Sequence, residues 1–360
     1  GYVAAVWLVA YGLFQVPGGL VGDRIGSRHL LTFLVLGWSL TLGGVGLTVF
    51  LPAGGWLPLA ALLVLRFVFG MFQAGGFPGL ARVLADWMPA QQRGFAQGMT
   101  WTFSRLGGAV APTLMVWLIT TFFGGGWTTP LWLLAALGLV WCALFWPWFR
   151  NRPEEMPQVN EAELDLISGL QIADCKLQIA ETNADVDSQS AISNLQSAIP
   201  LWRSLLTSHS VWGLCLMYGF VGFAGNFITS LLPIYLRDHR RLSDEQTGWL
   251  SGLPLACGVV SCLLGGVLSD WLIRRTGSRK WGRRLVGGAA LVLAGGACLS
   301  AIWSDEVWMI GLCVSAWFFF NDATMGPAWA ACADVGERDA GTLSGAMNMT
   351  GAFMGAIGMA

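Results

Sequence analysis

Long apolar stretches separated by short polar turns fill most of the chain, and one long polar stretch interrupts them near its middle. Each apolar stretch is roughly 20 residues or longer, which as a helix is enough to cross about 30 Å of hydrocarbon. The stretches are continuously apolar and lack the alternation of a membrane strand, so the pattern predicts helices. The predicted membrane segments are 1–18, 29–51, 57–84, 94–122, 130–149, 210–236, 247–271, 285–303, 307–331 and 341–360.

The long polar stretch, from about Arg150 to His209, is rich in Gln, Asn, Ser and Asp. This composition favours a low-complexity linker, with a short amphipathic helix as the alternative. The expected organisation is therefore an N-terminal bundle at 1–149, a linker at 150–209 and a C-terminal bundle at 210–360.

The composition indicates that lipid is the main solvent. Of the 360 residues, 55% are apolar and 11% are Asp, Glu, Lys or Arg, whereas soluble domains average about 25% charged residues. The 20 Trp and 48 Gly suit bilayer interfaces and close helix packing. A net charge of −1 provides no field for nucleic acid, so a nucleic-acid partner is not expected.

Basic residues are distributed unevenly between the two ends of the predicted bundle. Loops on one side hold 15 of the 20 Lys and Arg, whereas the opposite loops hold three, Arg237, Arg240 and Arg241. The positive-inside rule assigns the richer side, with the linker, to the cytoplasm. We therefore expect a multi-pass protein of the cell (inner) membrane, with Arg66 and Arg105 inside membrane segments.

An internal repeat relates the two predicted bundles. Asp23 of GGLVGD recurs 247 residues later as Asp270 of GGVLSD, and RIGSR at 24–28 resembles RTGSR at 275–279. Six segments separate the copies, so the repeating unit is six helices. A parallel repeat of this size matches the plan of two-bundle transporters. On that count the chain begins at helix 2 and stops at helix 11, with helices 1 and 12 missing.

The sequence contains no pattern typical of a metal or cofactor site. His29, His209 and His239 are scattered and form no HExxH pattern, and the eight Cys form no CxxC pair. Isolated Cys within apolar runs behave as small hydrophobic residues. No metal and no cofactor are expected.

The loop GGLVGDRIGSRH combines glycines four residues apart with Asp23, Arg24 and Arg28 where a helix leaves the membrane. An Asp there can pair with a cation or a helix terminus in one conformation and release it in another, which would bias a cytoplasmic gate. An ordinary charged turn is the alternative. The loop resembles the signature between helices 2 and 3 of the major facilitator superfamily, G-x-x-x-D-R-x-G-x-R, and the second copy, with Asp270, is degenerate.

Within that superfamily the chain resembles the anion:cation symporter family, which includes hexuronate, galactonate, glucarate and phthalate carriers. The resemblance implies an all-α major facilitator fold of two six-helix bundles that carries a small organic anion. The strings that carry it are YGLFQVPGGLVGDRIGSR (11–28), RFVFGMFQAGGFP (66–78), DWMPAQQRGFAQG (86–98), GLPLACGVVSCLLGGVLSD (252–270) and AGTLSGAMNMTGAFMGA (340–356).

Arg66 is the first candidate for a substrate site. It lies nine residues into segment 57–84, about 14 Å along the helix and so near the membrane midplane. A permanent cation there costs at least a few kcal/mol unless it is paired or wetted, so it indicates a function, with an interhelical salt bridge as the alternative. The resemblance implies that Arg66 grips the substrate carboxylate, for which a planar guanidinium is suited.

Three further polar residues are candidates for the same site. Tyr11 and Gln15 lie four residues apart on one face of a helix, and Asn348 lies among small residues of segment 341–360. Tyr11 would otherwise be an interfacial residue, and Asn348 a hydrogen-bond donor between helices. The resemblance implies that Tyr11 and Asn348 contact the substrate.

The candidates for ion coupling depart from the family pattern. The family commonly has a proton-carrying Glu two turns after the helix 4 Arg, where this chain has Gln73, which cannot titrate. In compensation, Arg105 and Asp322 are charges inside membrane segments. Asp322 is expected in the inner half of the membrane, where it faces Arg66 or Arg105 as a proton carrier or as a structural partner of Arg105.

Together these patterns favour a proton-coupled secondary carrier of a small carboxylate, such as a sugar acid, that works by alternating access as a monomer in the bilayer. A uniporter or exchanger of organic acids and a transport-dead membrane sensor are the alternatives. An intramembrane enzyme is not expected, because Asp322 has no second membrane carboxylate beside it in the sequence and no zinc-protease pattern occurs.

Overall fold

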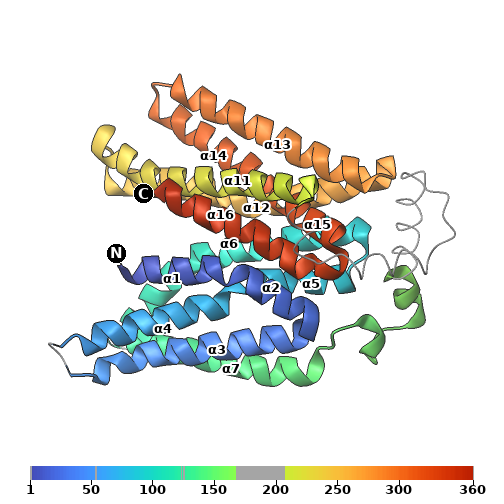
Figure 1. Cartoon of the computed structure of the whole chain (residues 1–360). Coiled ribbons are helices and arrows are strands. Elements are labelled where there is room, and N and C mark those ends of the chain that lie inside the picture. The colour runs from blue at the N-terminus through green and yellow to red at the C-terminus, as the bar shows by residue number, and fades with distance from the viewer. Residues whose placement is uncertain (1, 53–54, 123, 125, 168–206, 360) are drawn as a thin grey trace.

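The computed structural model describes residues 2–52, 55–122, 124, 126–167 and 207–359 (Figure 1). Within these residues the chain folds into helices and contains no strand, so the predicted all-α fold is confirmed there. Residues 168–206, which hold most of the predicted linker, lie outside the described part.

The N-terminal helices precede the linker, and the C-terminal helices follow it. The N-terminal helices are α1 (Tyr2–Leu13), α2 (Gln15–Ile25), α3 (Ser27–Leu47), α4 (Leu57–Ala74), α5 (Gly76–Trp87), α6 (Arg93–Trp117) and α7 (Thr128–Trp148). The C-terminal helices are α11 (His209–Ile234), α12 (Asp244–Thr276), α13 (Arg279–Ile302), α14 (Val307–Ala323), α15 (Met325–Gly336) and α16 (Ala340–Met359).

Three of the predicted segments are each divided into two helices, at the breaks α1/α2, α4/α5 and α14/α15. In all three cases the first helix ends four residues before a proline. A proline has no N–H to donate to the carbonyl four residues earlier, and its ring clashes with that carbonyl. The pairs are Leu13 with Pro17, Ala74 with Pro78 and Ala323 with Pro327.

The first predicted segment, 1–18, was too short. After a bend of 41° the chain continues as α2 to Ile25, so Asp23 and Arg24 lie in the last turns of a helix and not in a loop. Gly26 then takes a positive φ of 86°, which allows the chain to reverse into α3.

The lengths of the helices fit a membrane protein. In the described residues, eight stretches are long and apolar enough to cross a bilayer, and the bent pair α1/α2 makes a ninth. The last stretch, Val307–Met359, includes two predicted segments, 307–331 and 341–360, because the turn between them is short.

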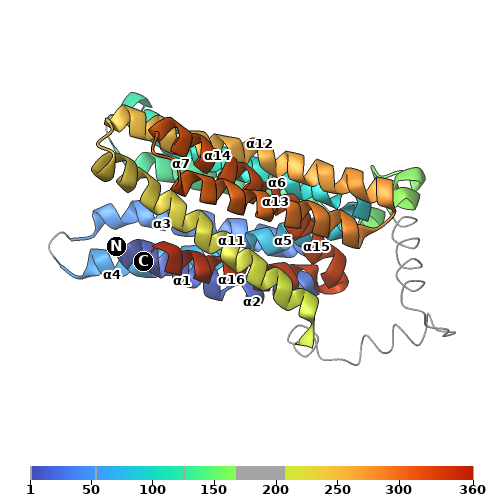
Figure 2. The same ribbon diagram turned by 90° about the horizontal axis from the view of Figure 1, so that it is seen from above.

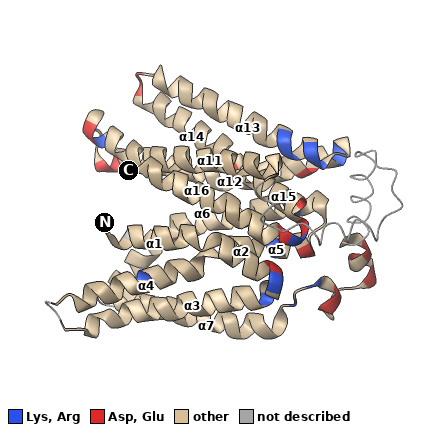
Figure 3. Ribbon diagram, in the orientation of Figure 1, with Lys and Arg blue, Asp and Glu red and all other residues tan. Residues whose placement is uncertain are grey.

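The N-terminal and C-terminal helices lie on opposite sides of a shared interface (Figures 1 and 2). There α6 packs along α12, and α2 packs along α16. Charged residues gather at the end where α2 stops and α13 starts (Figure 3), which we call the cytoplasmic end because it carries the loops that the positive-inside rule assigns to that side.

Glycines allow the backbones to touch across the interface. A Cβ atom on Gly19 would lie 2.3 Å from the carbonyl oxygen of Gly341, and one on Gly266 would lie 2.1 Å from that of Gly94. Both distances are too short for any side chain, so the α2–α16 and α12–α6 contacts require glycine.

Candidate functional site

Asp23 connects the two sets of helices at the cytoplasmic end. Its carboxylate accepts hydrogen bonds from the backbone N–H groups of Gly341 (3.0 Å) and Thr342 (2.7 Å) and from the Thr342 hydroxyl (2.6 Å). These N–H groups belong to the first turn of α16, where no intrahelical acceptor exists. Asp23 therefore caps α16 from α2, as the predicted contact between an Asp and a helix terminus requires.

Asp270 makes the corresponding contact in the opposite direction. It accepts from the backbone N–H groups of Gly94 (3.1 Å) and Phe95 (2.6 Å) at the start of α6, and it pairs with Arg283 at 2.6 Å. Gly341 and Thr342 follow Gly94 and Phe95 by the same 247 residues that separate Asp270 from Asp23. The repeat found in the sequence thus extends to the atoms that each carboxylate contacts.

The two arginines of the first loop do not join these contacts. Arg28 donates to the carbonyl oxygen of Trp146 at 2.9 Å and stacks over the Trp146 ring at 4.5 Å, so it ties α3 to α7. Arg24 is exposed and has no hydrogen bond or ion pair within the described residues. Neither arginine forms a bond between the N-terminal and the C-terminal helices in the described residues.

Sequence reasoning missed Asp334, which joins three helices beside Asp270. Its carboxylate pairs with Arg93 at 2.9 Å and with Arg283 at 3.2 Å, and all three side chains are at most 10% exposed. Asp334 stands in ACADVGERD, which has no feature that distinguishes it from an ordinary helix end. Arg82 was also missed, and it crosses from α5 to donate to the carbonyl oxygens of Glu337 and Arg338.

A cavity of about 370 Å³ lies between the N-terminal and C-terminal helices. It brings together three of the predicted site residues, Tyr11, Arg105 and Asn348, and it reaches Met359 at the end of α16 opposite the cytoplasmic end. Its other lining includes four aromatic and two amide side chains: Trp7, Trp101, Tyr218, Phe318, Asn226 and Asn321.

Tyr11, Gln15 and Asn348 form one hydrogen-bonded group. The side-chain amide of Asn348 donates to Gln15 Oε1 at 2.6 Å and to the Tyr11 hydroxyl at 3.2 Å. Gln15 is fully buried beneath the cavity, and its Nε2 has no acceptor within the described residues. These three residues from α1, α2 and α16 therefore hold one another in place at the wall of the cavity.

Arg66 does not line this cavity. It is the tenth residue of α4, and its position near the midplane stays a prediction. Its Nε is buried and has no acceptor within the described part of the chain. Gln73, two turns further along α4, accepts a hydrogen bond from Trp7 Nε1 at 2.9 Å, so it fastens α4 to α1.

Arg105 and Asp322 form an ion pair of 2.8 Å between α6 and α14. The Asp322 side chain is 1% exposed and the Arg105 side chain 33% exposed, and Asn321 also donates to Asp322 at 3.3 Å. Asp322 thus faces Arg105 and not Arg66. It is the last residue but one of α14 and directly precedes the break between α14 and α15.

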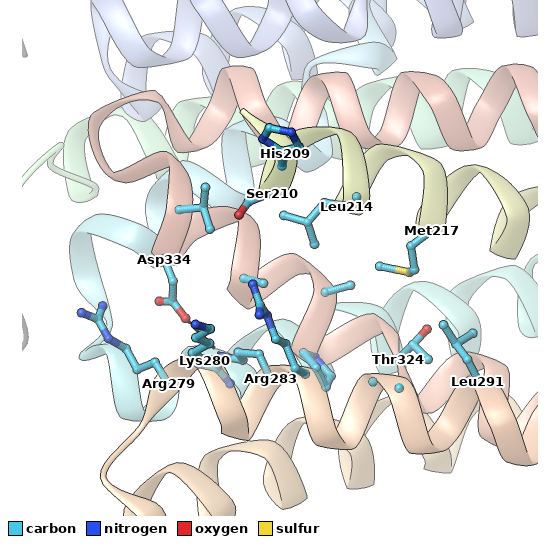
Figure 4. Close-up of a pocket in the computed structure, with 18 residues that line it drawn as sticks. His209, Ser210, Leu214, Met217, Arg279, Lys280, Arg283, Leu291, Thr324 and Asp334 are labelled. Atoms are coloured by element: carbon cyan, nitrogen blue, oxygen red, sulfur yellow. Dashed lines mark hydrogen bonds and ion pairs between the residues drawn. The ribbon is translucent and has the colours of Figure 1, made fainter. Parts of the chain in front are cut away.

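A second cavity, of about 510 Å³, lies among α11, α13 and α15 near the cytoplasmic end (Figure 4). Arg279, Lys280 and Arg283 stand on one side of it, and its apolar lining includes Leu214 and Met217. None of the predicted substrate residues lines it, and all three helices belong to the C-terminal set. It is therefore not a passage between the two sets of helices.

Comparisons with known proteins agree with this architecture. The family model of the Major Facilitator Superfamily matches residues 1–359. The solved proton:xylose symporter XylE superposes with a TM-score of 0.68 at 13% identity, over 100% of this chain and 77% of XylE. The human organic anion transporter MFSD10 gives 0.64 at 18% identity, over 100% of this chain and 76% of that chain.

Curated relatives are more similar in sequence. A protein of Cupriavidus necator named probable sulfoacetate transporter SauU is 33% identical over 353 residues, which are 97% of this chain and 74% of the relative. The probable galactarate/D-glucarate transporter GudP of Escherichia coli is 29% identical, over 99% of this chain and 76% of the relative. The hexuronate transporter of Bacillus subtilis is 26% identical, over 100% of this chain and 72% of the relative. The chain therefore belongs to the Major Facilitator Superfamily and, within it, to the anion:cation symporter family of multi-pass inner-membrane transporters.

Proposed function

We propose that the protein is a secondary active transporter of a small organic anion and not an enzyme. The observation that carries this proposal is the cavity between the two sets of helices, whose wall holds Arg105, Tyr11 and Asn348. A site at the interface of two repeated bundles is where a carrier that rocks between two states binds its substrate. The names of the relatives, which include sulfoacetate, galactarate and hexuronate transporters, support an organic acid as the substrate.

The anion is held by donors from both bundles, residues 1–149 and 210–360. Arg66 does not line the cavity in this arrangement, but its buried Nε has no acceptor within the described residues, and an uncompensated cation in a membrane segment favours an anionic ligand. Tyr11, Gln15 and Asn348 orient the substrate, and Arg105 supplies a second cation once Asp322 releases it. The protein works as a monomer, because one copy contains the whole interface.

Alternating access uses the caps at the cytoplasmic end as a gate. Asp23 and Asp270 tie each bundle to the first turn of a helix in the other, and these bonds have to break before the cavity can open toward the cytoplasm. Arg24 and Arg28 flank the gate, but neither contacts the opposite bundle in this arrangement, so the bonds that hold the gate shut do not include them.

Proton coupling runs through Asp322, since Gln73 cannot titrate. An incoming carboxylate competes with Asp322 for Arg105, and the buried Asp322 then takes up a proton, because an unpaired charge in that place is strongly unfavourable. A structural role for the Arg105–Asp322 pair, in a uniporter or exchanger, is the second candidate.

Transport by the purified protein in proteoliposomes tests the proposal. Labelled sulfoacetate, galactarate and a hexuronate should be screened, and an inward proton gradient should drive the accumulation of at least one of them. Arg66→Lys should lower binding sharply, because an ammonium lacks the planar fork. Binding without uptake would indicate a sensor, and neither binding nor uptake of any organic acid would refute the proposal.

One variant separates the two coupling schemes. If Asp322 carries the proton, Asp322→Asn should abolish accumulation driven by the gradient while counterflow exchange of the substrate persists. Accumulation that is unaffected by Asp322→Asn would rule out Asp322 as the proton carrier.

A further inference from the structure

One face of α6 carries three buried nitrogen donors without acceptors. Gln97 Nε2, Trp101 Nε1 and Arg105 Nε are all inaccessible and have no hydrogen-bond partner within the described residues. Residues 97, 101 and 105 are four apart, so their side chains form a stripe along one face of the helix. A buried donor without an acceptor is unfavourable, and two neighbouring donors of the stripe, about 6 Å apart along the helix axis, can share one acceptor group.

The stripe runs from the cavity toward the cytoplasmic end. Trp101 and Arg105 line the cavity, whereas Gln97 lies one turn nearer the start of α6 and is 1% exposed. Trp101 also forms the floor of the cavity, where its ring stacks on Phe77 at 4.7 Å and tilts against Trp329 at 5.4 Å. An acceptor that enters the cavity therefore meets Arg105 and Trp101 before it meets Gln97.

The internal repeat relates this stripe to Asn348 in α16. Asn348 follows Trp101 by 247 residues, the offset that relates Asp23 to Asp270. Both residues line the same cavity, from α6 in one half and from α16 in the other. Asn348 has acceptors in Tyr11 and Gln15, whereas the Trp101 indole has none. The two halves thus present donors at equivalent places, and of these two donors Trp101 is the one without an acceptor in the described residues.

We propose that Gln97, Trp101 and Arg105 form an oxyanion-binding stripe on α6, which receives the carboxylate or sulfonate of the substrate opposite Asn348. The Trp101 indole and the Arg105 guanidinium supply only donors, so they suit a group whose exposed atoms are all acceptors. Trp101 is the specificity-determining residue, because its single N–H has a fixed direction within a packed ring cluster. This inference rests on the proposed transport of an organic anion and adds the residues that bind the charged group.

Removal of the indole N–H tests the stripe. Trp101→Phe keeps an aromatic ring against Phe77 and Trp329 but has no donor, and Gln97→Met keeps the length of the side chain without its amide. Each should weaken binding of the transported anion about tenfold or more, since one lost hydrogen bond to a charged group is worth roughly 1.5–3 kcal/mol. Binding is measured by calorimetry on the purified protein, with sulfoacetate and a hexuronate as separate ligands.

Trp329→Phe is the matched control. Trp329 belongs to the same ring cluster and also has a buried Nε1 without an acceptor, but it does not line the cavity. Its substitution should leave the affinity within about twofold of wild type. Thermal unfolding without ligand checks that each variant folds, and Gln97→Met carries the test if Trp101→Phe does not.

The outcomes separate the two proposals. Wild-type affinity in both Trp101→Phe and Gln97→Met overturns the stripe, and buried water is then the partner of these donors. An equal loss in Trp329→Phe also overturns it, because ring packing and not the N–H would then control binding. If the wild-type protein binds no organic anion at all, the proposed function fails and the stripe fails with it.

Discussion

Asp23 and Asp270 occupy equivalent positions in the two halves and yet are supported differently. Each accepts two backbone N–H groups from the first turn of a helix in the opposite half. Asp270 also pairs with Arg283 at 2.6 Å, whereas the nearest cation to Asp23 is Arg82 at 3.9 Å, and the hydroxyl of Thr342 takes the closer place. The helix cap is therefore common to both halves, whereas the close ion pair with an arginine is present at Asp270 and not at Asp23.

The largest effect is expected from Asp270→Asn. This change leaves Arg283 with Asp334 as its remaining carboxylate and removes one acceptor from the start of α6. Breaking a buried pair at one partner should destabilise the protein by about 3 kcal/mol. Chemical unfolding in detergent measures this loss, and Arg283→Met/Asp270→Leu, which removes both charges, should recover part of it. A loss below about 1 kcal/mol would mean that the ion pair adds nothing to the cap.

A smaller loss is expected from Asp23→Asn. The amide oxygen can still accept one N–H of α16, and no buried cation is left without a partner, so the cost should be about 1–2 kcal/mol. The same unfolding measurement applies. If Asp23→Asn lowers the free energy of unfolding as much as Asp270→Asn does, the helix cap and not the ion pair provides most of the stabilisation in both halves.

Arg28→Ala removes contacts inside the N-terminal helices only. It loses the stacking on Trp146 and the bond to the Trp146 carbonyl, for which about 0.5–1 kcal/mol is expected. Because Arg28 does not touch the C-terminal helices, its substitution should not change the accessibility of a Cys introduced in the cavity. The measurement is the rate of thiol labelling of a Thr229→Cys reporter, compared between the protein with Arg28 and the Arg28→Ala variant. A changed labelling rate would assign Arg28 to the gate.

The smallest effect is expected from Arg24→Ala. Arg24 is exposed and has no partner within the described residues, so its removal should change the free energy of unfolding by less than about 0.5 kcal/mol. A larger change would show that the charge of Arg24 stabilises the Asp23 cap without a direct contact. Asp23 and Asp270 would then differ less in their support by a cation.

The sequence supported accurate predictions where a single physical rule was sufficient. Hydropathy located the helices, and the 247-residue offset anticipated that Asp23 and Asp270 make related contacts. The three helix breaks lie four residues before Pro17, Pro78 and Pro327, but a proline alone does not predict a break, because Pro112 and Pro254 lie inside helices that continue.

Other features depend on contacts between residues that are far apart in the sequence, and no local pattern encodes these contacts. Asp334 meets Arg93 across 241 residues and Arg283 across 51, and an acidic residue at a helix end does not reveal such partners. Arg66 was expected in the substrate site together with Tyr11 and Asn348, but it does not line the cavity that holds them, and the sequence does not encode which helices border that cavity. The stripe on α6 could not be predicted either, because the sequence does not show which buried donors lack an acceptor.

The backbone contacts of Gly19 with Gly341 and of Gly94 with Gly266 have a consequence for the rate of opening. A surface made of main-chain atoms has no rotamers to lose when it forms and none to rearrange when it parts. Side-chain entropy therefore contributes little to either direction of movement at these two crossings. In the proposed gate, the barrier to opening then depends on the bonds of Asp23, Asp270 and Asp334 and on those that Arg82 donates to Glu337 and Arg338, so single hydrogen bonds set its height.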